Sequence, residues 1–327
     1  MRSPRTSGRL KNRSLVLLSG EGTTLPRAEA AALFSMYDPG STFQTPEPRV
    51  LLAQSSADPF KVGERIAFAR RAGTCVDSPT EALPLLAGRR VRFRCFDLGT
   101  HRAKPDPGEY LRGARAVIDL ERPEYELTMV RGRDVYLAVT SPGRMIQGWA
   151  TRRPRKRPFF HPSAIFPKLS RALVNLSRCR EGDRFVEPFA GTGSIALEAH
   201  LVGAEVIAMD IAAKMAEGAL SNMRHFRQEW LGIVRGDAAA IPLRTAGAIA
   251  TDIPYGRASS TKGRDPGSIM GEALASIGPM MRKGSRAVFM HPQNLPIDGG
   301  PLLCVREEHH LHVHKLLTRT ITVLERN

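Results

Sequence analysis

The chain has four cysteines in 327 residues, and no two of them form a Cys-x-x-Cys pair. Their scatter argues against a zinc site and against a disulfide framework, and it is typical of a protein in a reducing cytoplasm. Histidines alternate between His309 and His314 along an expected strand. Metal binding needs ligands that converge on one point, so a row along a strand favours a structural role. We therefore predict a cytoplasmic protein without a metal site.

The sequence also lacks a long apolar run. No segment approaches the ~20 consecutive apolar residues that a membrane-spanning helix needs. Residues 1–13 are basic, but no apolar core follows them before a cleavage site, so no secretory signal is expected. The sequence predicts no membrane partner.

Acidic residues are few relative to basic ones. There are 48 lysines and arginines against 32 aspartates and glutamates, a formal net charge of +16. Residues 1–160 hold 28 basic and 16 acidic residues, whereas residues 161–327 hold 20 and 16. A generic basic surface for solubility does not explain this imbalance, but an N-terminal part that grips a polyanion does. We therefore expect a nucleic acid partner.

Residues 141–160 contain six basic residues and no acidic one, and Pro154 and Pro158 interrupt the run. One interpretation is a solvated connector that proline stiffens. The other is a segment that tracks phosphates between two lobes, which the basic stretch before it favours. The predicted RNA-binding residues are Arg152, Arg153, Arg155, Lys156 and Arg157.

A glycine turn lacks the third glycine of the nicotinamide-binding motif G-x-G-x-x-G. The turn Glu187-Pro188-Phe189-Ala190-Gly191-Thr192-Gly193 joins an apolar strand at 184–187 to a helix expected at 194–201. Ser194-Ile195-Ala196 follows, so a bound pyrophosphate is not indicated. Glycine tolerates positive φ and has no Cβ, so the backbone can still approach a small ligand closely.

Acidic residues end the next two expected strands. Asp210 follows the strand at 205–209 and suits the diol of a ribose. Asp237 lies near the end of the strand at 233–238 and could accept from an exocyclic adenine amine. Helix N-capping is the alternative for each acid taken alone. Two such acids in register with the glycine turn favour a nucleotide-like cofactor.

A second motif, Asp252-Ile253-Pro254-Tyr255, follows the apolar run at 246–250. It places an acid, a turn-forming proline and an aromatic ring at the carboxyl end of a strand. An amine with a delocalised lone pair needs such a site, because a carboxylate and a backbone carbonyl can accept its two N–H bonds. The ring can stack on the flat heterocycle that carries the amine.

Together these segments resemble the successive motifs of Rossmann-like S-adenosylmethionine-dependent amino-methyltransferases. Residues 157–169, Arg-Pro-Phe-Phe-His-Pro-Ser-Ala-Ile-Phe-Pro-Lys-Leu, are similar to the segment before the first motif in archaeal THUMP-domain tRNA guanine-N2 methyltransferases that act on guanosine 10. Residues 252–260 resemble their catalytic stretch, and residues 314–319 resemble their closing strand. Two positions depart from the family pattern, with Ile253 in place of the usual proline and Ala190 where cysteine is frequent.

The resemblance implies that S-adenosylmethionine is the cofactor. The cofactor-binding residues that it implies are His161, Ser163, Glu187, Phe189, Ala190, Gly191, Gly193, Asp210, Ile211, Asp237 and Ala238. The catalytic residues that it implies are Asp252, Ile253, Pro254 and Tyr255.

The predicted fold class is α/β. Residues 161–327 are expected to form a Rossmann-like methyltransferase sheet closed by a C-terminal antiparallel hairpin. The resemblance places a ferredoxin-like domain at 1–75, a THUMP-like RNA-binding domain at 76–145 and a basic linker at 146–160. A helix is expected near 60–71 in the first of these parts.

The expected activity is methylation of the N2 amine of a tRNA guanosine, with position 10 as the expected site. Three alternatives stay open at this point. They are another tRNA or ribosomal RNA guanosine, the amine of DNA adenine or protein glutamine, and a non-catalytic RNA-binding protein that retains the fold. We expect a monomer, while the number of methyl groups added and an activating subunit are left open.

Overall fold

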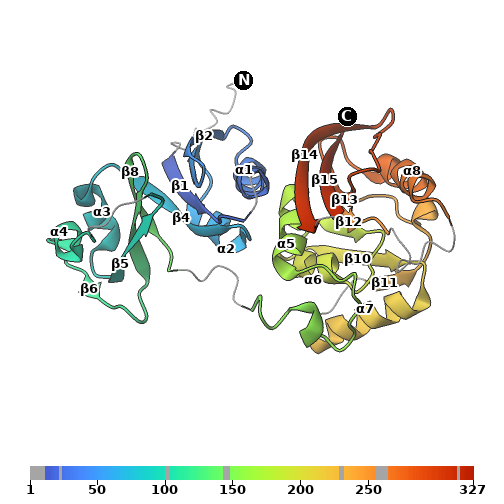
Figure 1. Cartoon of the computed structure of the whole chain (residues 1–327), viewed down its shortest axis with the longest axis horizontal. Helices are drawn as coiled ribbons and strands as arrows, with labels where there is room; N and C mark the ends of the chain where they lie inside the picture. The colour runs from blue at the N-terminus through green and yellow to red at the C-terminus, as the bar shows by residue number, and fades with distance from the viewer. Residues whose placement is uncertain are drawn as a thin grey trace, which may run out of the picture. The chain divides into compact units, whose positions relative to one another are not determined.

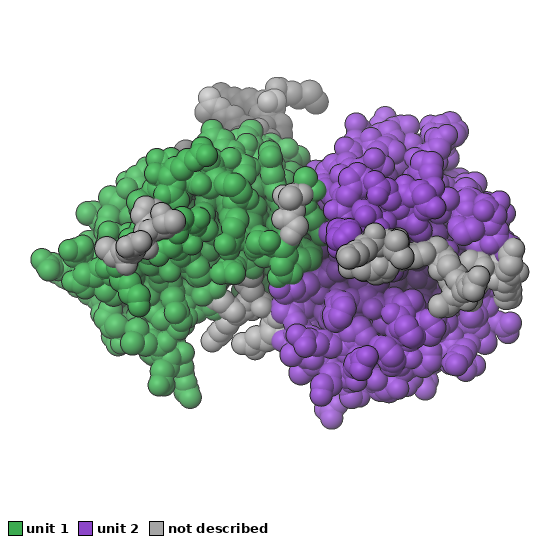
Figure 2. Space-filling view, in the orientation of Figure 1, with its two compact units in different colours: residues 1–147 green, residues 148–327 purple. Residues whose placement is uncertain are grey.

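The computed structural model describes residues 12–21, 24–99, 104–142, 148–227, 232–254, 264–314 and 317–327. The chain divides into two compact units, residues 1–147 and residues 148–327, coloured green and purple in Figure 2. Each unit has its own sheet (Figure 1). Among the described residues, no helix is long and apolar enough to cross a membrane.

The first unit is built on an eight-stranded sheet with the order β2-β3-β1-β4-β8-β7-β5-β6. Its elements are β1 (Asn12–Leu18), α1 (Leu25–Tyr37), β2 (Thr42–Glu47), β3 (Val50–Ser55), α2 (Pro59–Arg65), β4 (Ala69–Val76), α3 (Pro79–Leu86), β5 (Arg90–Asp97), α4 (Pro107–Leu111), β6 (Val117–Ile118), β7 (Tyr125–Arg131) and β8 (Val135–Thr140). Strand β4 pairs with both β1 and β8. The expected boundary between residues 75 and 76 lies inside β4, so one sheet runs through both stretches, and their division into two domains stays a prediction.

The helix expected at 60–71 is shorter in the structure, because α2 ends at Arg65. The buried carboxylate of Glu29, on α1, accepts the backbone N–H groups of Ala67 and Phe68 at 2.8 Å each. Buried backbone donors need partners. Glu29 supplies them outside a helix, and the chain then continues into β4.

The second unit is built on a seven-stranded sheet with the order β11-β10-β9-β12-β13-β15-β14. Its elements are the 3-10 helix η1 (Pro154–Lys156), α5 (Pro167–Leu176), β9 (Arg184–Glu187), α6 (Ser194–His200), β10 (Glu205–Asp210), α7 (Ala213–His225), β11 (Gly232–Arg235), the 3-10 helix η2 (Ala238–Ala240), β12 (Ala248–Asp252), α8 (Pro266–Ile277), the 3-10 helix η3 (Gly278–Met280), β13 (Arg286–Pro292), β14 (Leu303–His314) and β15 (Leu317–Arg326). The first five strands in chain order are parallel. Strand β15 pairs antiparallel with β13 and with β14, which confirms the predicted C-terminal hairpin.

Strand β9 lies in the interior of this sheet, between β10 and β12. Its central residues Phe185 and Val186 are 0% and 1% exposed, as expected for a parallel strand covered on both faces. From β9 the chain continues to β10 and β11 on one side and then returns to β12 on the other. The carboxyl ends of these strands therefore meet at one edge, where the strand order reverses.

The distribution of charge over the two units differs from the sequence expectation. Residues 1–147 carry 23 basic and 16 acidic residues, a net charge of +7, and residues 148–327 carry 25 and 16, a net charge of +9. The expected excess in the N-terminal part is therefore wrong for the units of the structure. The physical reason is that residues 148–160, with five basic side chains, belong to the second unit.

Candidate active site

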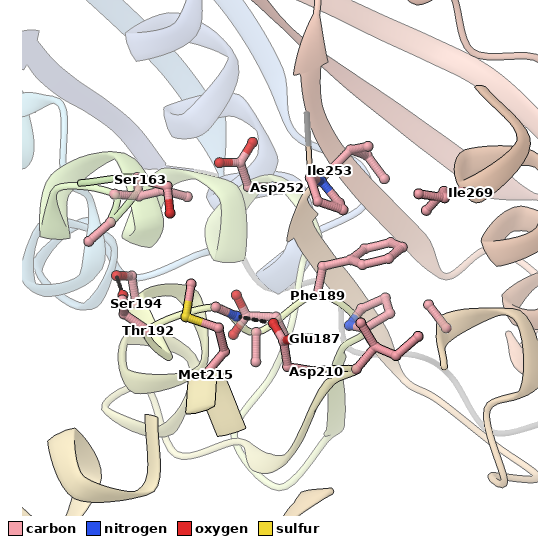
Figure 3. A pocket seen from close by; sticks show the side chains of 18 of the residues that line it. Ser163, Glu187, Phe189, Thr192, Ser194, Asp210, Met215, Asp252, Ile253 and Ile269 are labelled. Atoms are coloured by element: carbon pink, nitrogen blue, oxygen red, sulfur yellow. Dashed lines mark hydrogen bonds between the residues drawn. The ribbon is translucent and has the colours of Figure 1, made fainter. Parts of the chain in front are cut away.

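A cavity of about 310 Å³ lies at the carboxyl ends of β9, β10 and β12. In an open parallel sheet, ligands bind at this edge beside the point where the strand order reverses, here between β9 and β12. Sites for small molecules and cofactors start at roughly this volume. Figure 3 shows Phe189, Asp210, Met215 and Asp252 around the same space. The edge that the motifs predicted is the edge where the cavity lies.

The glycine turn forms one wall of this cavity. Gly191 and Gly193 have φ angles of +53° and +75°, in the left-handed region that favours glycine. A Cβ built at Gly191 would meet no atom of the described chain within 4 Å, because Gly191 faces the cavity. The turn therefore presents backbone, without a side chain, to whatever occupies the space.

Two buried acids hold the turn. Glu187 accepts the backbone N–H of Ala196, in the first turn of α6, at 2.7 Å. Asp210 accepts the N–H of Gly191 with Oδ2 and that of Ala212 with Oδ1, both at 2.9 Å. Burial is the main cause that raises the pKa of each acid, and the charges of Asp210 and Asp252 add to it at Glu187. A positive charge placed beside these acids would favour their ionised forms, so this wall suits a cationic ligand.

Asp237 follows β11 and is a helix cap, which is the alternative considered for it. Its Oδ1 accepts the N–H of Ala239 at 3.0 Å and so caps the 3-10 helix η2. Its Oδ2 accepts from Nη1 of Arg264 at 2.8 Å, and Arg264 also contacts Glu272 on α8. Asp237 and Arg264 both line the cavity. The oxygen expected to receive an adenine amine is therefore already bound by a guanidinium.

Asp252 is the last residue of β12, and its side chain is 16% exposed. Its Oδ2 accepts from Nη1 of Arg319 at 3.0 Å. Its Oδ1 is buried and has no hydrogen-bond partner among the residues that the structure describes. Burial raises the pKa of Asp252 to about 7, while the positive charge of Arg319 acts in the opposite direction. A buried acceptor without a partner is costly, so this oxygen fits an incoming N–H donor.

The residues after Asp252 complete this edge. Ile253 is 1% exposed, packs in the core beside the cavity, and donates its N–H to the carbonyl of Met290 on β13 at 2.9 Å. Proline, the usual family residue here, has no N–H and could not make this bond. Pro254 lines the cavity. Tyr255 and the polar stretch up to residue 263 lie outside the described residues.

The segment before α5 is tied to the turn by one buried amide. Asn222 on α7 accepts the N–H of Phe159 at 2.9 Å and donates to the carbonyls of Phe159 at 3.0 Å and Thr192 at 2.9 Å. The ring of Phe159 lies against Gly218, where a Cβ would come within 2.1 Å of it. This packing brings residues 162–165 to the cavity wall.

The comparisons with known proteins agree with this geometry. Residues 154–298 match the family model described as RMKL-like, methyltransferase domain. A tRNA (guanine(10)-N2)-dimethyltransferase from Methanothermobacter thermautotrophicus is 31% identical over 338 residues, which span 95% of this chain and 99% of that protein. The chain belongs to this tRNA (guanine(10)-N2)-dimethyltransferase family.

Two further proteins resemble the chain either over a shorter stretch or at lower sequence identity. A tRNA (guanine(6)-N2)-methyltransferase from Thermus thermophilus is 34% identical over 145 residues, or 41% of this chain and 40% of that protein. The crystal structure of TrmN from Thermus thermophilus has a TM-score of 0.50 at 20% identity and covers 96% of this chain and 100% of that one. The predicted resemblance and the Rossmann-like methyltransferase fold are confirmed.

Most of the predicted cofactor-binding residues of this methyltransferase line the cavity. They are Ser163, Glu187, Phe189, Ala190, Gly191, Asp210, Ile211, Asp237 and Ala238. Gly193 caps α6 behind the turn instead. His161 does not line the cavity, but its Nδ1 lies 2.7 Å from the hydroxyl of Ser163, which does. Assignment of these residues to the cofactor stays a prediction.

The predicted RNA-binding residues separate into two groups. Arg152 and Arg157 are 7% and 6% exposed. Arg152 binds the buried carboxylate of Glu198 at 2.7 Å, and Arg157 donates to the Ser194 hydroxyl at 2.6 Å. These two arginines hold the enzyme's own α6, so their burial favours a structural role, and phosphate contact by them stays a prediction. Arg153, Arg155 and Lys156 are exposed.

Sequence reasoning gave no role to three residues that the structure brings to the site. Arg264 and Arg319 line the cavity, and Asn222 braces its wall. A cation in the closing strand was the available signal for Arg319. Nothing local in the sequence distinguishes Asn222 or Arg264 from other polar residues on helices and loops.

Proposed function

We propose that this protein transfers a methyl group from S-adenosylmethionine to the N2 amine of a tRNA guanosine, with guanosine 10 as the expected position. One observation carries the proposal. Asp252 presents a buried carboxylate oxygen without a partner among the described residues, in the same cavity as the glycine turn. A catalytically inert RNA-binding protein would have no use for this costly arrangement. Membership of the dimethyltransferase family supports the tRNA substrate.

The residues of the cavity fit S-adenosylmethionine. The open space at Gly191 admits the methionine portion, and the acidic wall of Glu187 and Asp210 suits its ammonium group and the ribose diol. Bound there, S-adenosylmethionine supplies a methyl group on a positively charged sulfur. Arg264 already binds Asp237, so the adenine amine has to share that carboxylate or find a backbone acceptor near Ala238.

The residues of the second motif then act on the guanine. The lone pair of its exocyclic amine is delocalised into the ring, which makes the nitrogen a poor nucleophile. Asp252 Oδ1 accepts one amine N–H, and we assign the second to the backbone carbonyl of Ile253. These bonds draw the nitrogen toward tetrahedral geometry and aim its lone pair at the methyl group, so that positioning and electrostatics supply the acceleration.

The remaining motif residues hold the base. Pro254 fixes the turn after β12, and Tyr255 is assigned to stack on the guanine. A base inside a helix cannot reach such a cavity, so the guanosine has to leave the stack. For the rest of the tRNA we assign phosphate contacts to Arg153, Arg155 and Lys156, and RNA recognition to residues 1–145, which include the predicted THUMP-like domain at 76–145.

Mass spectrometry of tRNA nucleosides tests this function. The protein is incubated with a tRNA transcript and isotopically labelled S-adenosylmethionine, and the RNA is digested to nucleosides. We expect labelled N2-methylguanosine or N2,N2-dimethylguanosine. Label in another nucleoside, in DNA adenine or in no product would overturn the proposal.

Two changed transcripts resolve the position. A transcript with adenosine at position 10 should lose the label, whereas one changed at position 6 should keep it. The second transcript is the matched control, because a partial relative modifies guanine 6. The reverse result would assign position 6, and label retained in both would point to another guanosine.

A further inference from the structure

Arg319 reaches the proposed catalytic acid from outside the strands that carry the motifs. It lies on β15, where Arg319 is opposite Pro292 of β13, and Met290 of β13 is in turn opposite Asp252 of β12. Figure 1 shows β15 beyond β13, in the C-terminal hairpin. The Arg319 side chain therefore extends across one strand. Its Nη1 lies 3.7 Å from the sulfur of Met290 and 3.0 Å from Oδ2 of Asp252.

The two oxygens of the Asp252 carboxylate differ in their hydrogen bonds. Arg319 binds Oδ2, while Oδ1 has no partner within the described parts of the chain. Asp252 and Arg319 both line the cavity. Since a carboxylate is planar, fixing one oxygen with a side chain from β15 also fixes the direction in which the other oxygen points.

We propose that Arg319 is a positioning residue for methyl transfer, which binds Oδ2 of Asp252 and thereby presents an ionised Oδ1 to the amine of the guanine. The inference rests on the proposed function of Asp252. It assigns to the antiparallel hairpin a part in catalysis as well as in closing the sheet.

Arginine is the residue suited to this role. Its guanidinium keeps its charge at every relevant pH, is planar, and is more weakly hydrated than the ammonium of lysine, so it tolerates a partly buried site. The side chains of Arg319 and Asp252 are each 16% exposed. Water therefore screens their attraction less than it would at the surface. A carboxylic acid without this partner would favour its neutral form in such surroundings.

The other charged groups of the cavity do not favour the ionised form of Asp252. Glu187 at the end of β9 and Asp210 at the end of β10 are acids that line the same cavity, and a negative charge on Asp252 is unfavourable beside a charged Glu187. Asp237 and Arg264 are paired with each other. Arg319 is thus the cation that contacts Asp252 directly, and burial and Arg319 together leave the pKa of Asp252 at about 7.

The proton balance of the reaction explains why ionisation matters. The lone pair of the amine forms the new N–C bond, the S–C bond breaks, and its electrons stay on sulfur as a neutral thioether. The nitrogen then carries an extra proton, which Asp252 Oδ1 can accept when it is ionised. Protonated Asp252 could not take this proton, so the rate should rise as Asp252 loses its own.

Single-turnover methylation of a tRNA transcript, measured between pH 5.5 and pH 9, tests the proposal. For the unchanged protein the rate should rise with pH and level off above about 7, the pKa of Asp252. Arg319→Gln should lower the plateau by up to roughly 100-fold, as expected for a small misplacement of a group that contacts the reacting atoms. It should also move the midpoint to higher pH by at least about 1 unit, because the cation that favours the carboxylate is gone, and a rate that still rises at pH 9 shows the same effect. Arg319→Lys keeps a positive charge, so its midpoint should lie close to that of the unchanged protein. Its plateau should lie between those of the unchanged protein and Arg319→Gln.

Several outcomes would overturn the proposal. A purely structural Arg319 would lower the rate by the same factor at every pH and leave the midpoint unchanged. Calorimetric binding of S-adenosylmethionine and thermal unfolding identify a variant that has lost its fold. If Arg319→Gln does not fold, Arg319→Lys takes its place in a double-mutant cycle with Asp252→Asn. A rate loss that persists in full without the Asp252 carboxylate counts against the role, and so does an Arg319→Lys plateau equal to that of the unchanged protein.

A double-mutant cycle gives an independent measurement. In an Asp252→Asn background there is no carboxylate to ionise, so Arg319→Gln should have little further effect. Fully additive losses would contradict the proposal. Failure of the proposed function is a separate result, because the unchanged protein would then form no N2-methylated guanosine at all.

Discussion

Two buried acids, one in each unit of the chain, differ in how their carboxylates are bound. In the first unit, Glu126 on β7 is fully buried, and the guanidinium groups of Arg71, Arg92 and Arg94 lie around its carboxylate. In the second unit, Asp252 has one arginine on one oxygen and a second oxygen that faces the cavity. Both acids are held by arginine from another strand of the same sheet. They differ in that three arginines surround the carboxylate of Glu126, whereas one oxygen of Asp252 can still accept a hydrogen bond from another donor.

Glu198 of the second unit confirms that position in a unit is not the cause. It is fully buried and binds Arg152 and Arg171, so it resembles Glu126 rather than Asp252. Because a buried ion pair rarely gains much stability over apolar packing, such clusters act mainly by fixing one arrangement of the chain. The net charges of the units are nearly equal. It is the unsatisfied acid, and not the total charge, that identifies the site.

Asp252→Ala removes the carboxylate that has an oxygen left for another donor, and we expect the largest effect from this change. Methyl transfer should fall by roughly 100- to 1,000-fold or more, as when one preorganised polar group is removed from a catalytic site. Affinity for S-adenosylmethionine should stay nearly unchanged, because the proposed partner of Asp252 is the guanine amine. Labelled methyl transfer and calorimetry measure the two quantities. A parallel loss of cofactor binding would mean that Asp252 serves the cofactor or the fold.

Gly191→Val tests the wall of the cavity with a control in the other unit. The new side chain should occupy the open space beside the turn and weaken S-adenosylmethionine binding by roughly 10- to 100-fold. Gly88→Val is the matched control. Gly88 has a φ of +71°, and a Cβ built on it would meet no atom of the described chain within 4 Å, but it lies in the first unit, outside the glycine turn. Both variants carry similar backbone strain.

Calorimetry separates the two causes. Near-normal cofactor affinity in Gly191→Val would sink the placement of the cofactor at the turn. An equal loss of cofactor affinity in both variants would show that backbone strain, and not the filled space, is responsible.

Features encoded within a few residues could be predicted from the sequence. The strand at 184–187, the left-handed glycines and the acids at the strand ends follow from local patterns, and parallel strands bring those ends together. Interactions between distant basic and acidic residues could not be predicted. Arg319 and Asp252 are 67 positions apart, and Arg152 and Glu198 are 46 apart.

The basic segment shows the physical limit of such predictions. Arg152 and Arg153 are neighbours of the same residue type, yet the first is buried and the second is exposed. Their burial depends on α6, which supplies Glu198 beneath the segment. A run of like charges in a sequence carries no information about which of its members will find a buried partner.

Arg152→Ala should therefore change stability rather than RNA binding. Loss of a charged hydrogen-bond partner at a buried carboxylate costs about 1.5–3 kcal/mol in the free energy of unfolding. Chemical denaturation measures the loss, and exposed Arg153→Ala is the control, with an expected change within about 0.5 kcal/mol. Equal stability of the two variants would contradict the structural role assigned to Arg152.

The smallest expected effect is on the salt dependence of RNA binding. Replacing Arg153, Arg155 and Lys156 by alanine should reduce the slope of log affinity against log salt by about 0.7–0.9 for each phosphate that these side chains no longer neutralise. The control replaces Arg244, Arg282 and Lys283, which are exposed. They precede the amino ends of β12 and β13, whereas the cavity lies at the carboxyl ends of the strands. Both triple variants remove the same charge, so a difference between them reports direct binding of phosphate and not net charge.

Affinity should fall to a similar degree for most RNAs, because phosphate contacts position a nucleic acid without reading its bases. Filter binding of tRNA and of an unrelated RNA across a salt series measures both quantities. Equal slopes for the two triple variants would reduce the exposed half of the basic segment to a connector. RNA recognition would then rest with residues 1–145 or with side chains nearer the cavity.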